Sequence, residues 1–136
     1  MTTLGGFGSC YTRVASGIDL PVPPGTPVLA TGAGRVTQTF TDHPVLGVGV
    51  VIEMDNELTT LSAHLYSYGD FGIGAYVNPG DTIGFSGNTG MTRGDGHLHF
   101  TVWPPGANIP NFRAGQRFTE DDFFCTIDPL TVLPPQ

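Results

Sequence analysis

The chain has 136 residues, which is enough for one domain with a modest core. Its 12 acidic and 5 basic residues give a formal net charge of -7, so the sequence lacks the basic character that favours nucleic acid as a partner. Only 12% of the residues are charged, whereas glycine and proline number 20 and 12, a composition typical of short strands and many turns. No apolar run approaches the ~20 residues of a membrane-spanning helix.

The two ends of the sequence were inspected for a signal peptide and for cysteines that could form a disulfide. Residues 1–6 carry neither a charged segment nor an apolar segment of the signal-peptide kind, so we expect no signal peptide. Cys10 and Cys125 lie near opposite ends of the chain. They could close a large loop as a disulfide or remain two separate thiols, and the spacing leaves both alternatives open.

Short strand patterns separated by turn signals recur along the chain. In chain order, the expected strands cover residues 27–30, 34–40, 48–54, 58–65, 82–85 and 97–103. The turn signals between them cover residues 23–25, 55–57, 78–81 and 87–90. The β-branched run at 48–54 is continuous rather than alternating, which predicts a strand buried on both faces. Together these patterns predict an all-β fold built mainly from antiparallel strands.

Helix signals are confined to the C-terminal part of the chain. Thr119 and Asp122 have the spacing of a capping box, and Asp128-Pro129 is typical of a helix start. We therefore expect at most short terminal helices. The preceding segment, residues 104–117, is interpreted as a long surface loop.

Two of the four histidines, His97 and His99, lie two residues apart in an expected strand. This spacing places both imidazoles on one face, while Leu98 and Phe100 point to the opposite face and into a core. Two such imidazoles can bind a metal, or one can bind it while the other transfers protons. The simpler alternative is a strand with two exposed histidines.

Three separated segments form a larger pattern around this pair. They are residues 17–36, with the sequences Gly-Ile-Asp-Leu, Pro-Gly-Thr-Pro-Val-Leu-Ala and Gly-Arg-Val; residues 61–65, Leu-Ser-Ala-His-Leu; and residues 77–100, from Val-Asn-Pro-Gly-Asp-Thr-Ile-Gly to Gly-His-Leu-His-Phe. In order and spacing this pattern resembles the lysostaphin-type (LytM-like) zinc metallopeptidases. The resemblance covers residues 8–133, which indicates a single domain over residues 1–136.

The resemblance implies an antiparallel, partly coiled sheet with a groove walled by long loops. It also implies an endopeptidase that cuts peptidoglycan peptides with a zinc ion and its bound water. Asp19 and His99 would be zinc ligands, and His64 and His97 would be the paired catalytic histidines. The alternatives are that Asp19 is a turn or capping acid and that His64 is a core or surface histidine.

The sequence departs from the family pattern at its first zinc ligand. A histidine is expected four residues before Asp19, and this chain has Ala15, whose methyl group cannot bind a metal. Catalytic zinc sites normally have three protein ligands, so Asp19 and His99 alone leave the set incomplete. His43, with Asp42, is a weaker substitute; otherwise His43 is interpreted as a loop residue.

Lesser departures concern the surroundings of the expected site. Ser62 replaces a tyrosine that often precedes the middle histidine by two residues, and the loop at 91–95 is one residue longer than usual. Trp103 is interpreted as packing at a sheet edge rather than as a binding platform.

Three functions are compatible with this sequence. The first is a peptidoglycan-directed domain that is impaired or inactive because Ala15 replaces a ligand. The second is an active zinc endopeptidase with a replacement ligand, or one whose histidine was changed to Ala15 by engineering. The third is a non-enzymatic structural or partner-docking module. The expected binding partner is a peptidoglycan peptide.

The expected location is a phage virion or the cell wall. A chain without a signal peptide could be carried in a phage tail or baseplate, where other tail proteins would be partners. The alternative is an extracellular, cell-wall location.

Overall fold

The structure, a computed structural model, describes residues 18–90 and 98–112. These residues form nine strands, and none of them is helical. The strands are β1 (Ile18–Leu20), β2 (Pro27–Leu29), β3 (Gly34–His43), β4 (Gly47–Met54), β5 (Thr59–Ala63), β6 (Leu65–Tyr68), β7 (Tyr76–Val77), β8 (Thr82–Ser86) and β9 (Leu98–Trp103). The predicted all-β class is confirmed. The helix signals at 119–122 and 128–129, and both cysteines, lie outside the described residues.

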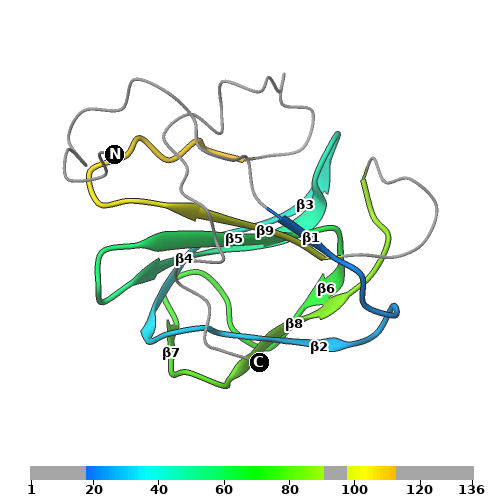
Figure 1. The fold of residues 1–136 in the computed structure, drawn as a ribbon, viewed down its shortest axis with the longest axis horizontal. Coiled ribbons are helices and arrows are strands. Elements are labelled where there is room, and N and C mark those ends of the chain that lie inside the picture. Colours follow the sequence, from blue (N-terminus) through cyan, green and yellow to red (C-terminus); the bar gives the residue numbers. More distant parts are fainter. Residues whose placement is uncertain (1–17, 91–97, 113–136) are drawn as a thin grey trace.

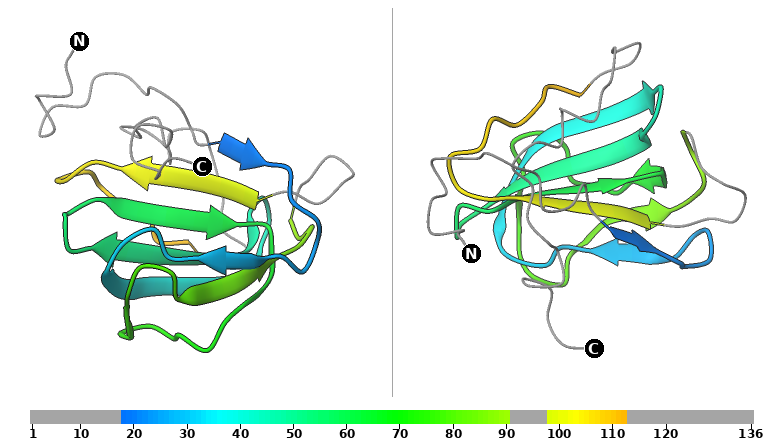
Figure 2. Two further views of the ribbon diagram at one scale, coloured as in Figure 1. Left: turned by 60° about the horizontal axis from the view of Figure 1, so that its bottom comes forward. Right: turned by 45° about the horizontal axis from the view of Figure 1, so that its top comes forward.

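The strands form two antiparallel sheets. The larger sheet has the order β1-β9-β5-β4-β3-β7, and the smaller has the order β2-β8-β6. The smaller sheet lies against one face of the larger one (Figure 1). The large sheet is strongly twisted, as the two further views show (Figure 2). Its twist follows from the right-handed twist of each strand.

The core lies on both faces of the larger sheet, with β4 and β5 at its centre. Every residue of β5 is buried, and β4 is exposed only at Glu53. The two-sided burial expected for 48–54 is thus confirmed. One apolar cluster fills the space between the sheets: Val28, Ala30, Val36, Val50, Ile52, Met54, Leu65, Val77, Ile83 and Leu98. The other cluster covers the opposite face: Phe40, Leu46, Val51, Leu61, Ala63, Trp103 and Phe112.

Two of the expected turns have the geometry that their sequences predict. Gly25 and Gly80 follow Pro24 and Pro79 and have φ angles of 88° and 90°. Proline at the second turn position and a glycine with positive φ at the third define a type II turn. The Asp81 carboxylate accepts a hydrogen bond from the Asn78 amide at 2.8 Å, which closes the second turn.

The expected strand at 58–65 is broken at His64. β5 ends at Ala63 in the larger sheet, and β6 begins at Leu65 in the smaller sheet. His64 between them has a φ of 61°, a left-handed conformation that L-residues with a side chain rarely adopt. The prediction of one continuous return strand was therefore wrong, because the chain changes sheets at this residue.

Over its described length, residues 104–112, the segment after β9 is an irregular loop whose residues 105–111 are exposed or half-buried, as predicted, but the core anchors it at Phe112. Phe112 is buried between Phe40 and Trp103, with ring centroids 5.3 and 6.1 Å away. The Gln38 side chain accepts a hydrogen bond from the Phe112 amide at 2.9 Å and donates one to the Pro110 carbonyl at 2.8 Å. Trp103 is itself fully buried at the end of β9, where it pairs with Thr59 of β5, so it packs in the core as predicted.

The edge strand β7 was not expected from the sequence, and side chains on its neighbours hold it. Tyr76 pairs with Arg35 of β3, whose guanidinium lies 5.6 Å from the ring centroid. The Tyr76 hydroxyl donates to the Asp55 carboxylate. This hydrogen bond and the neighbouring negative charge raise the pKa of Tyr76, because its phenolate would lose the bond and be repelled. Arg35 opposes the shift.

We expect Phe112→Ala to destabilise the protein by about 3–5 kcal/mol, because it removes a buried ring and leaves a cavity. Ile73→Ala is the matched control, since Ile73 is 68% exposed. Its effect should stay within about 0.5 kcal/mol. Urea unfolding of both variants measures the difference. Equal stability of the two would show that the segment after β9 does not belong to the core.

Candidate functional site

The expected metal ligands Asp19 and His99 are brought together by strand pairing. β1 pairs with β9, and the backbone of Asp19 lies directly opposite that of His99. On its other side, His99 lies opposite Ala63 of β5. Opposed residues in antiparallel strands have Cα atoms about 4.5–5.5 Å apart. Two residues 80 positions apart in the sequence (99 − 19) thus become neighbours.

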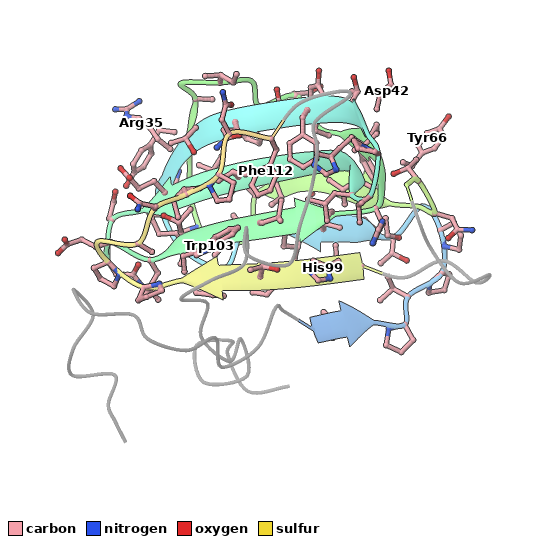
Figure 3. The ribbon with its side chains drawn as sticks, turned by 90° about the horizontal axis from the view of Figure 1, so that it is seen from above. Arg35, Asp42, Tyr66, His99, Trp103 and Phe112 are labelled. Carbon is pink, nitrogen blue, oxygen red and sulfur yellow. The ribbon has the colours of Figure 1, made fainter. Side chains whose placement is uncertain are left out.

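His99 stands near the start of β9, on the face that carries Trp103 (Figure 3). Its ring is half-buried, and its Nε2 lies 2.7 Å from the hydroxyl oxygen of Thr101, two residues along the same strand. Leu98 and Phe100 are buried on the opposite face, as predicted. Metal-binding histidines commonly use one ring nitrogen for the metal and the other for a hydrogen bond. With Nε2 beside Thr101, Nδ1 is the nitrogen that could hold a cation.

His64 lies next to His99 because of the break between β5 and β6. The two rings have centroids 6.0 Å apart and meet edge to face at 81°. The His64 backbone amide donates to the Leu46 carbonyl at 2.8 Å, and its Nδ1 lies 2.7 Å from the Thr89 carbonyl oxygen. A carbonyl oxygen can only accept, so Nδ1 carries the hydrogen. In the neutral ring, Nε2 then carries the lone pair and can accept a proton.

The other expected site residues lie outside the described part of the chain. These are His97, the second catalytic candidate, and Ala15, which occupies the position of the missing ligand. Among the described residues, no group of three or more histidine, cysteine, aspartate or glutamate side chains could hold a metal ion.

His43 is a buried strand residue, so its interpretation as a loop residue was wrong. It is the last residue of β3 and is only 2% exposed, with its ring packed against Phe40 and Phe112. Its Nδ1 accepts hydrogen bonds from the amides of Val45 and Leu46 at 3.1 and 3.0 Å. This ring holds the turn between β3 and β4.

Ser62 lies away from the His64 and His99 rings. It pairs with Phe100 and Val50, which face the space between the sheets, and it is 1% exposed. Opposed residues on neighbouring strands share a face. The replacement of a tyrosine by Ser62 therefore changes the interior between the sheets rather than the face that carries His99.

Thr89 and Thr101 contact the candidate histidines but were not singled out from the sequence. Thr101 follows His99 by two residues, so the alternation of the strand places both on one face. That signal was available. Thr89 lies in the predicted turn at 87–90, and its contact with His64 depends on tertiary folding.

Comparison with known proteins shows the family to which this chain belongs. The profile of Peptidase family M23 matches residues 13–110. The peptidoglycan DD-endopeptidase ShyA of Vibrio cholerae is 40% identical over 107 residues, which cover 72% of this chain and 24% of that protein. The chain thus spans about a quarter of the length of this relative.

Two solved structures share the fold. Lysostaphin from Staphylococcus simulans has a TM-score of 0.68 and 25% identity, over 93% of this chain and 48% of that one. An alanine-to-histidine mutant of the catalytic domain of EnpA, a prophage-encoded M23 protein from Enterococcus faecalis, has a TM-score of 0.60 and 25% identity. That alignment covers 71% of this chain and 72% of the other.

The chain belongs to peptidase family M23, and its fold is that of the lysostaphin-type peptidases. The family resemblance seen in the sequence is confirmed. In the parts of the chain that the structure describes, no helix is both long and apolar enough to cross a bilayer.

We expect His43→Leu to destabilise the fold by about 1–3 kcal/mol, because the Leu46 amide loses its acceptor in a buried setting. The zinc content of the purified protein should stay unchanged. Thr41→Ala, at an exposed position of β3, is the control and should be neutral. Unfolding and elemental analysis give the two readouts. A loss of bound zinc in His43→Leu would instead identify His43 as a replacement ligand.

Proposed function

We propose that this chain is a peptidoglycan-directed domain of an M23 peptidase whose metal site is incomplete as written. The observation that carries the proposal is the pairing of Asp19 with His99, beside the His64 ring, in a chain that has alanine at position 15. Peptidoglycan as the binding partner is supported by the similarity to ShyA, which is a peptidoglycan DD-endopeptidase.

The proposed roles follow from the chemistry of each residue. Asp19 and His99 would hold a zinc ion, and zinc, when bound, would supply an activated water. His64 and His97 would handle protons, with Nε2 of His64 as an acceptor. Because the donor set lacks a third protein ligand, zinc affinity should be lower than in a complete site by on the order of 100-fold, since about 10–16 kcal/mol of binding is shared among four ligands in structural sites.

The proposed setting is a phage virion. One solved relative, EnpA, is prophage-encoded, and it was studied as an alanine-to-histidine mutant of its catalytic domain. Both features fit a phage protein in which alanine occupies a histidine position. Other tail proteins would then be partners. The cell wall outside a bacterium is the alternative location.

An active endopeptidase is the second candidate. Its support is the 40% identity with ShyA, together with the family membership. This candidate requires a replacement ligand from the residues outside the described part, and it predicts activity without any substitution.

We expect Ala15→His to raise the zinc content of the purified protein from substoichiometric to about one ion per chain, because it completes three protein ligands. Thr41→His, at an exposed position, is the control for adventitious binding by an added histidine. Asp19→Ala in the Ala15→His background should remove the ion again. Elemental analysis after dialysis measures each variant.

The same proteins are then compared on purified peptidoglycan, with release of soluble fragments as the readout. Activity only in Ala15→His supports the proposal. Activity in the unsubstituted chain would contradict it and favour the second candidate. Stoichiometric zinc without activity in Ala15→His would favour a binding or docking role.

A further inference from the structure

Thr89 connects three separate segments around His64. Its hydroxyl oxygen accepts a hydrogen bond from the Val48 amide at 3.1 Å and donates one to the Leu65 carbonyl at 2.6 Å. Val48 belongs to β4, and Leu65 is the first residue of β6. The turn after β8 is thereby fixed to both sheets. Each bond uses a different capacity of the hydroxyl group, one as acceptor and one as donor.

The backbone carbonyl of Thr89 accepts a hydrogen bond from Nδ1 of His64 at 2.7 Å. The His64 amide is held separately by the Leu46 carbonyl. His64 thus keeps a positive φ, a conformation that persists only when the surrounding structure over-determines it. Its ring orientation depends on where the Thr89 carbonyl is placed, and that placement depends on the Thr89 hydroxyl.

Two glycines allow Thr89 to approach this closely. Gly47 and Gly90 both have positive φ angles, of 71° and 78°. A Cβ atom on Gly47 would overlap the Thr89 hydroxyl and backbone, and one on Gly90 would overlap the Val45 carbonyl. The turn at 87–90 and the start of β4 therefore pack backbone against backbone, which leaves the Thr89 carbonyl little room to move.

We propose that Thr89 is a positioning residue for His64. Its hydroxyl anchors the turn, and its carbonyl keeps the ring in the form that carries hydrogen on Nδ1 and a lone pair on Nε2. This inference rests on the proposed function only in giving Nε2 of His64 a proton-accepting role. The hydrogen-bond arrangement itself requires neither metal nor turnover, so the two can fail separately.

The test measures the His64 tautomer directly. Long-range ¹H–¹⁵N spectra of histidine-labelled protein, at a pH where the ring is neutral, distinguish hydrogen on Nδ1 from hydrogen on Nε2. The proteins are the unsubstituted chain, Thr89→Val, Thr89→Ser and the control Thr41→Val, which changes an exposed threonine of β3.

We expect the Nδ1–H form to dominate in the unsubstituted chain, in Thr89→Ser and in Thr41→Val. In Thr89→Val, the ratio of the Nδ1–H to the Nε2–H form should fall by about fivefold or more, the factor that corresponds to about one hydrogen bond. Because serine keeps the hydroxyl group and lacks the methyl group, a normal ratio in Thr89→Ser would show that the hydroxyl group, and not the shape of the side chain, is responsible.

Two results would overturn the proposal. One is a dominant Nε2–H form of His64 in the unsubstituted chain, a measurement that needs no variant to fold. The other is an unchanged tautomer ratio in folded Thr89→Val. If the tautomer behaves as expected while Ala15→His neither binds zinc nor acts on peptidoglycan, the positioning role stands and the proposed function fails.

Discussion

The arrangement of the candidate site depends on the antiparallel pairing of β1, β9 and β5. This pairing sets Asp19, His99 and Ala63 in one row across the sheet. A slip of one residue in either register would turn His99 to the other face and bury it between the sheets. The register is held by the alternation of β9, because Leu98 and Phe100 are buried on one side and Trp103 on the other. Core packing and site geometry are therefore consequences of the same strand.

The second constraint is the left-handed residue that joins the two sheets. Most side chains avoid a positive φ, at a cost of about 1–3 kcal/mol in a folded protein. His64 adopts it where hydrogen bonds from its amide to Leu46 and from its ring to Thr89 offset this cost. The same break removes His64 from the alternation of β5 and sets its ring beside that of His99. A straight strand through this position would not join the two sheets in this way.

The longer sequence patterns predicted the fold. Very short elements, and features that depend on contacts between distant parts of the chain, were not predicted. The continuous apolar run of β4 and the Pro-Gly turns reflect local chemistry and were predicted correctly. β7 has only two residues, too few to show the two-residue alternation of a strand. The residue at the break, His64, is not a glycine, so nothing in the sequence indicated its positive φ angle.

His43 precedes a proline, which is typical of a loop residue, but its ring accepts hydrogen bonds from two backbone amides of the following turn. Phe112 follows an irregular stretch with three prolines, and its buried position involves a contact with Gln38, 74 residues earlier in the chain. For the site, motif spacing singled out His64 and His99 as candidates, and their rings lie 6.0 Å apart in the structure. The contacts of Thr89 could be seen only in the folded chain.

The most direct measurement of the central claim is anomalous diffraction at the zinc edge from crystals of the Ala15→His protein grown with zinc. The account predicts one strong peak at the β1–β9 pair, within about 2.0–2.2 Å of a carboxylate oxygen of Asp19 and a ring nitrogen of His99. The unsubstituted protein under the same conditions should show a weak peak or none at that position. A strong peak coordinated by other residues, or a peak of equal strength in both proteins, would contradict the account.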